Sequence, residues 1–139
     1  MTERMRRLAV ALGALAVLQA LHLLDEIRTS EEPDPTGLAS LVAPEAFAGI
    51  GGALLAWWGV RQAKSWAPTL AIVTAVLVSV GFLLVHGLPW ASERTEPYWG
   101  DGSADVLQWA GVLAIWAASV VVVVRAREAR AETLAPAPA

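Results

Sequence analysis

A histidine and two acids lie close together near the start of the chain: His22, Asp25 and Glu26. Positions i, i+3 and i+4 share one face of an α-helix, because each residue advances by about 100°. Imidazole and carboxylate groups on one face can bind a divalent metal ion or transfer protons. Counted from Leu8 at about 1.5 Å per residue, His22 lies roughly 21 Å into a hydrocarbon core about 30 Å thick. Ionisable groups at that depth are costly unless they face protein or water, so they predict a functional site.

The composition predicts an integral membrane protein. Of the 139 residues, 56% are hydrophobic and 17% are charged, which is too apolar for an ordinary soluble protein. The chain has no cysteine, which excludes disulfides and thiolate metal sites, and no basic face of the kind that binds nucleic acid. A signal peptide is not expected, because the apolar run after the basic start continues to Leu24 without a small-residue cleavage site.

Four apolar segments, each near the twenty residues needed to cross a bilayer, predict the fold. We expect one all-α domain over residues 1–130, a four-helix transmembrane bundle with up-down-up-down topology, because the connections are short. The predicted helices span about 6–27, 41–62, 67–88 and 103–126, and residues 131–139 form a disordered Ala/Pro tail.

The distribution of basic residues predicts the orientation. Eight Lys and Arg residues accompany the N-terminus, the second loop and the C-terminus: Arg4, Arg6, Arg7, Arg61, Lys64, Arg125, Arg127 and Arg130. Two, Arg28 and Arg94, lie on the other side. The positive-inside rule then places both termini in the cytoplasm, with the chain spanning the plasma membrane. Aromatic belts agree with this orientation: Trp57, Trp58 and Trp66 on the inner side, and Trp90, Tyr98 and Trp99 on the outer side.

In this topology every predicted helix brings an ionisable group to its outer end. The candidate site residues are His22, Asp25 and Glu26 from the first helix, Glu45 from the second, His86 from the third and Asp105 from the fourth. This coincidence predicts one shared, outward-facing site. A structural reading competes for each of them. Asp25 and Glu26 can mark the helix exit, acids such as Glu45 and Asp105 stabilise the first turn of a helix, and His86 near an interface can bind a backbone carbonyl.

Three kinds of chemistry are open to this set. A divalent metal (Zn²⁺, Fe²⁺ or Mn²⁺) would take its ligands from His22, Glu26, Glu45, His86 and Asp105. Acid/base catalysis on a lipid-soluble substrate would use His22, Asp25, Glu26 and His86. The same groups could carry protons or ions in a transporter.

The second predicted helix suggests a non-enzymatic alternative. Ala48, Gly52 and Ala56 follow the small-xxx-small spacing that lets helix backbones approach closely. Packing inside one bundle explains this spacing, and so does a homodimer or a membrane subunit that binds a partner through this face. The subunit hypothesis predicts that Gly52→Leu disrupts assembly while His22→Ala does little.

At His22-x-x-Asp25-Glu26, with His86 late in the third helix and Tyr98 near a glycine, the chain resembles the His-x-x-Glu-Glu family of small bacterial membrane proteins. In that family the first acid is Glu, and Tyr-x-Pro-Gly follows the second histidine. This chain instead has Asp25 and Pro97-Tyr98-Trp99-Gly100. The resemblance implies a four-helix membrane protein and carries no established activity.

Overall fold

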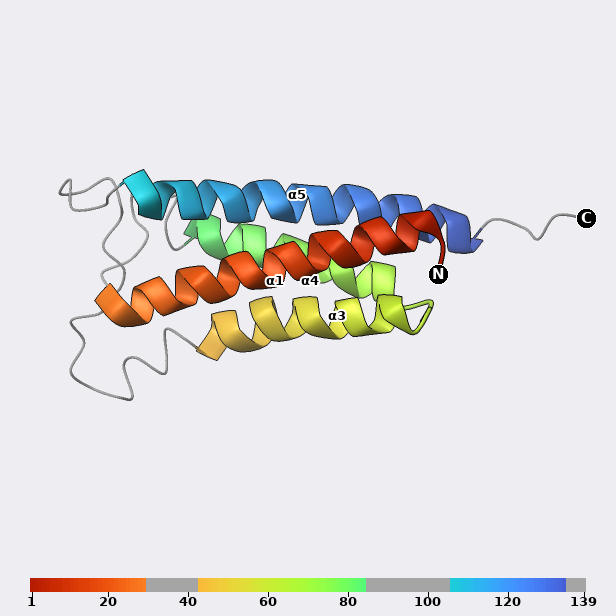
Figure 1. The fold of residues 1–139 in the computed structure, drawn as a ribbon, viewed down its shortest axis with the longest axis horizontal. Helices are drawn as coiled ribbons and strands as arrows, with labels where there is room; N and C mark the ends of the chain where they lie inside the picture. Colours follow the sequence, from red (N-terminus) through yellow and green to blue (C-terminus); the bar gives the residue numbers. More distant parts are fainter. Residues whose placement is uncertain (30–42, 85–105, 135–139) are drawn as a thin grey trace, which may run out of the picture.

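The computed structural model describes residues 1–29, 43–84 and 106–134, and within these ranges helices are the only regular secondary structure. The helices are α1 (Glu3–Thr29), the π-helix η1 (Glu45–Gly51) that runs directly into α3 (Gly52–Arg61), α4 (Ala67–Phe82) and α5 (Val106–Leu134). Consecutive helices run in opposite directions along the long axis (Figure 1). The predicted all-helical fold with four helices is therefore confirmed.

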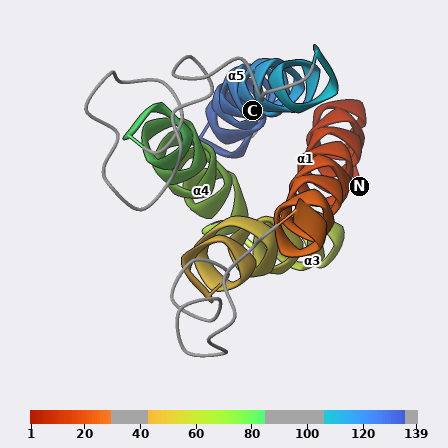
Figure 2. The same ribbon diagram turned by 90° about the vertical axis from the view of Figure 1, so that its left-hand side faces the viewer.

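Seen from one end, the helices form a ring in the order α1, α3, α4, α5 (Figure 2). Each helix packs against the two beside it, and α5 closes the ring on α1. Both termini and the α3–α4 turn lie at one end, called here the terminal end (Figure 1). The opposite end contains η1, the last turns of α1 and α4 and the start of α5, and is called the η1 end.

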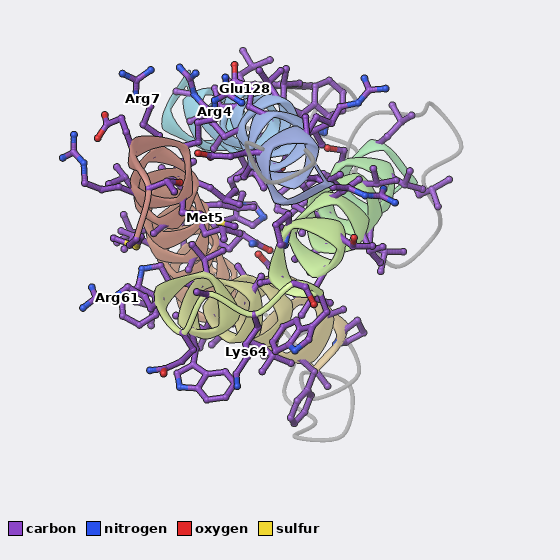
Figure 3. The ribbon with its side chains drawn as sticks, turned by 90° about the vertical axis from the view of Figure 1, so that its right-hand side faces the viewer. Arg4, Met5, Arg7, Arg61, Lys64 and Glu128 are labelled. Atoms are coloured by element: carbon purple, nitrogen blue, oxygen red, sulfur yellow. The ribbon has the colours of Figure 1, made fainter. Side chains whose placement is uncertain are left out.

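One face of α1 forms a continuous buried seam. Its residues are Leu8, Leu12, Leu15, Gln19 and His22, separated alternately by four and three positions. This alternation is the spacing of a helix that keeps one face toward its partners in a bundle. The seam is leucine toward the terminal end, where Met5 also points inward (Figure 3), and it is polar toward the η1 end.

Small residues bring α3 close to its neighbours. A Cβ at Gly52 would lie 2.8 Å from Thr74 Oγ1 of α4, and Ala53, Ala56 and Gly59 are buried. The close packing predicted at Gly52 and Ala56 is thus used inside the bundle, whereas Ala48 is exposed. Leucine at Gly52 would clash within a single chain, so loss of assembly in that variant would not indicate a homodimer. The homodimer stays a prediction.

Two helices extend beyond their predicted bounds. α1 begins at Glu3 and ends at Thr29, and α5 continues past residue 126 to Leu134, which takes in the start of the expected tail. Contacts between the two ends of the chain support this extension: Thr2 Oγ1 donates to Glu132 Oε2 at 3.0 Å, and Arg4 Nη1 donates to Glu128 O at 3.5 Å. Residues 131–134 are therefore helical, which corrects the predicted start of the disordered tail. Residues 85–88 and 103–105, predicted as parts of the third and fourth helices, lie outside the described ranges.

Two segments, Glu3–Asp25 and Trp109–Glu132, are long and apolar enough to cross a membrane, and Ala67–Phe82 is a shorter apolar helix. Three tryptophans of the predicted inner belt gather at the terminal end, and the belt itself stays a prediction. The Trp58 and Trp66 rings lie 6.4 Å apart, and the Arg61 guanidinium lies 5.1 Å from the Trp57 ring. Trp90, Tyr98 and Trp99 fall outside the described residues.

Candidate functional site

The polar half of the α1 seam centres on Gln19. Its side chain is 0% exposed, and neither Nε2 nor Oε1 has a hydrogen-bond partner among the described residues. A buried polar atom without a partner costs about 1–3 kcal/mol, and such atoms are rare in folded proteins. A leucine at this position would bury no polar atom and would avoid this energetic cost. The amide therefore marks a position that packing alone does not explain.

His22 lies almost one turn further along the same face. Its side chain is 7% exposed, its Nε2 is buried, and its ring packs against Phe82 of α4 with centroids 4.9 Å apart and planes tilted by 49°. The imidazole thus faces the interior of the bundle, as the depth argument predicts. Phe82 supplies an apolar wall beside it.

The π-helix η1 lies opposite Gln19. Gly49 is buried within η1, and a Cβ added there would fall on Gln19 Oε1, so glycine is what lets the amide fit. Glu45 is the first residue of η1, is partly buried, and has one carboxylate oxygen, Oε1, buried. π-Helical segments occur frequently at functional sites. η1 packs against both α1 and α4, which places its acid at the polar end of the seam.

α5 brings one further buried polar group to this half of the bundle and another to its middle. Trp116 Nε1 and Ser119 Oγ are buried without hydrogen-bond partners among the described residues. Arg4 of α1 contacts Glu128 of α5, which sets the two antiparallel helices in register. At about 1.5 Å per residue, Gln19 lies roughly 22 Å from Arg4, whereas Trp116 and Ser119 lie roughly 18 Å and 14 Å from Glu128. Trp116 is therefore within one helical turn of the height of Gln19, and Ser119 lies nearer the middle of the bundle.

The remaining predicted site residues are placed less fully. Asp25 is partly buried near the end of α1, and Glu26 belongs to α1 although its side chain is not described. His86 and Asp105 lie outside the described residues. Within the part of the chain that is described, no three histidine or acidic side chains gather closely enough to hold a metal. The metal centre therefore stays a prediction that depends on the other candidates.

Sequence reasoning missed Gln19 and Trp116. A signal for Gln19 is present, because it continues the four-and-three spacing of Leu8, Leu12 and Leu15 and so falls on the buried face. The site that the structure describes is thus an amide, an imidazole and a carboxylate from α1 and η1, beside the Phe82 ring. This combination can bind a polar group through donors and acceptors together and can exchange a proton with it.

No protein-family model matches the chain, and no curated protein or solved structure matches it. The resemblance to the His-x-x-Glu-Glu family stays a prediction. Function is therefore inferred from the site itself.

Proposed function

We propose that this chain is a four-helix integral membrane protein that binds the polar group of a lipid-soluble molecule between α1 and η1 and exchanges a proton with it through His22. The observation that carries the proposal is Gln19, a fully buried amide with neither polar atom paired among the described residues. A group of this kind gains its hydrogen bonds when a ligand supplies a donor and an acceptor.

Each residue of the site has a role in this proposal. The Gln19 amide orients a carbonyl or hydroxyl, because it offers both a donor and an acceptor. Imidazole changes charge near neutral pH, so His22 is suited to give or take the proton. Glu45 at the start of η1 supplies a carboxylate as base or counter-charge, and the Phe82 ring packs against the imidazole. The substrate class is a hydrophobic molecule with one hydroxyl or carbonyl.

The surface of the bundle supports placement in a membrane. Large apolar side chains are exposed along every helix, among them Val17, Phe47, Leu54, Leu55, Leu77, Leu84, Leu113 and Val120. Such a surface suits lipid far better than water. The excess of Lys and Arg at the terminal end favours cytoplasmic termini, which would put the polar site in the outer half of the plasma membrane.

Acid/base chemistry is favoured over the other predicted chemistries because the described residues suffice for it. Zinc, iron or manganese bound by His22 and Glu45 would need a further ligand from Glu26, His86 or Asp105. A transport function would need a continuous polar path across the bundle, and the leucines of the α1 seam fill the terminal half. The subunit hypothesis leaves the buried amide unexplained.

The test is to purify the protein in mild detergent and identify co-purified small molecules by mass spectrometry. Gln19→Leu should lose the bound molecule and yet raise the melting temperature. The unpaired polar atoms destabilise the fold by about 1–3 kcal/mol, and the leucine side chain removes this penalty. His22→Phe should also lose the molecule or its turnover. Ser119→Ala is the matched control, since it alters a buried polar residue of α5 and should retain the molecule.

Equal recovery of the molecule from Gln19→Leu and from the unchanged protein would refute the site. Membrane placement has its own check: the protein should stay with membranes through an alkaline carbonate wash. Release into the wash would overturn the membrane part of the proposal.

A further inference from the structure

A groove of about 490 Å³ runs between α1 and α5 at the terminal end. Its lining is Glu3, Arg6, Arg7, Val10, Ala11, Ala14, Val121 and Arg125. The three arginines lie nearest the chain termini, and the apolar residues continue from them toward the middle of the bundle. The groove is thus basic at one end and apolar along its length.

Carboxylates orient the arginines of this groove. Glu3 accepts hydrogen bonds from Arg6 Nε at 2.7 Å, Arg6 Nη2 at 2.9 Å and Arg7 Nε at 2.9 Å. Arg125 Nη1 donates to Glu128 Oε2 at 3.0 Å. A guanidinium has five N–H donors in a planar fork, so these bonds fix the side chains and leave donors for an anion.

Positive charge exceeds negative charge at this end even after these pairs are counted. Its eight basic residues, Arg4, Arg6, Arg7, Arg61, Lys64, Arg125, Arg127 and Arg130, face only three acids, Glu3, Glu128 and Glu132. Arg4, Arg7 and Glu128 lie on the α1–α5 side, whereas Arg61 and Lys64 lie on the α3 side (Figure 3). The groove therefore has a basic mouth that is distinct from the other basic residues of the same end.

We propose that this groove binds one anionic phospholipid, with its phosphodiester on Arg6, Arg7 and Arg125 and an acyl chain along the apolar lining. Basic pockets between helices at the cytoplasmic side of a membrane bind anionic headgroups. The apolar continuation selects a lipid over a free phosphate ion, because only a lipid has a chain to fill it. The inference rests on the membrane placement proposed above and is independent of the Gln19 site.

Native mass spectrometry of the detergent-purified protein, titrated with phosphatidylglycerol or phosphatidylcholine, tests this site. We expect phosphatidylglycerol to bind more tightly, and each arginine removed to weaken it about fivefold, as for a basic residue near an anionic lipid. The test variant is Arg7→Gln with Arg125→Gln. The matched control is Arg61→Gln with Lys64→Gln, which removes the same charge on the α3 side and should change binding little.

A second variant tests the acyl-chain part. Ala14→Trp keeps every arginine and fills the exposed apolar lining, so it should weaken phosphatidylglycerol as well. Water-soluble glycerol phosphate should not compete. Equal weakening in both double variants would reduce the effect to general electrostatic attraction, and competition by glycerol phosphate would identify a phosphate site; either result overturns the proposal. His22→Phe should leave phosphatidylglycerol binding intact, so failure of the polar site is distinguished from failure of this one.

Discussion

At the terminal end the buried face of α1 consists of Leu8, Leu12 and Leu15, whereas at the η1 end the same face presents Gln19 and His22. At the terminal end the acid Glu3 is exposed and pairs with Arg6 and Arg7. The η1 end instead buries an amide without partners among the described residues. The terminal half of α1 thus stabilises the bundle, whereas its η1 half lowers stability by burying unpaired polar atoms.

The two ends of the bundle therefore have different roles. Leucine packing at the terminal end contributes stability but offers no polar or ionisable group. The polar half is where a ligand can form hydrogen bonds. Proteins commonly accept such local cost at functional sites. Substitutions in the leucine half should therefore change stability, whereas substitutions in the polar half should change ligand binding.

The largest effect is expected in the leucine half. Leu12→Ala should lower the free energy of unfolding by about 2–5 kcal/mol, because it opens a cavity in a fully buried position. Thermal unfolding in mild detergent, followed by circular dichroism, measures the change. Val17→Ala on the exposed side of α1 is the matched control and should shift stability far less. Similar losses in both variants would mean that the leucine seam does not support the bundle.

The contact between α1 and η1 gives a smaller effect with a specific signature. Gly49→Ala should destabilise by about 1–3 kcal/mol, since its methyl group would overlap Gln19 Oε1. Combining it with Gln19→Ala should remove most of that penalty, and a double-mutant cycle measures the coupling. Gly13→Ala, where an added Cβ meets nothing within 4 Å, should be neutral or stabilising. Additive losses in the double variant would show that the two residues do not meet.

How far the sequence predicts this arrangement depends on the kind of signal. Apolar runs of near-spanning length predict α1, α3, α4 and α5, and the depth of His22 predicts its burial. Gln19 is not predicted as a site residue because a single amide does not interrupt an apolar run. Only the four-and-three spacing of the leucines indicates that it lies on the buried face. The π-helix escapes because it does not follow the 3.6-residue period, and its glycine makes sense only opposite Gln19. The positions of His86 and Asp105 lie outside the described residues.

The smallest effect concerns the turn between α3 and α4, at the terminal end. Ala63 has a φ of 51°, in the left-handed region, and Lys64 N donates to Gly59 O at 2.9 Å across the turn. Alanine in this conformation costs about 1 kcal/mol relative to glycine, so Ala63→Gly should raise the melting temperature slightly. It should leave the occupancy of the polar site unchanged, whereas Gln19→Leu should gain stability and lose the bound molecule. If Ala63→Gly also lost the molecule, the two ends would be coupled, and the leucine half and the polar half would not have separate roles.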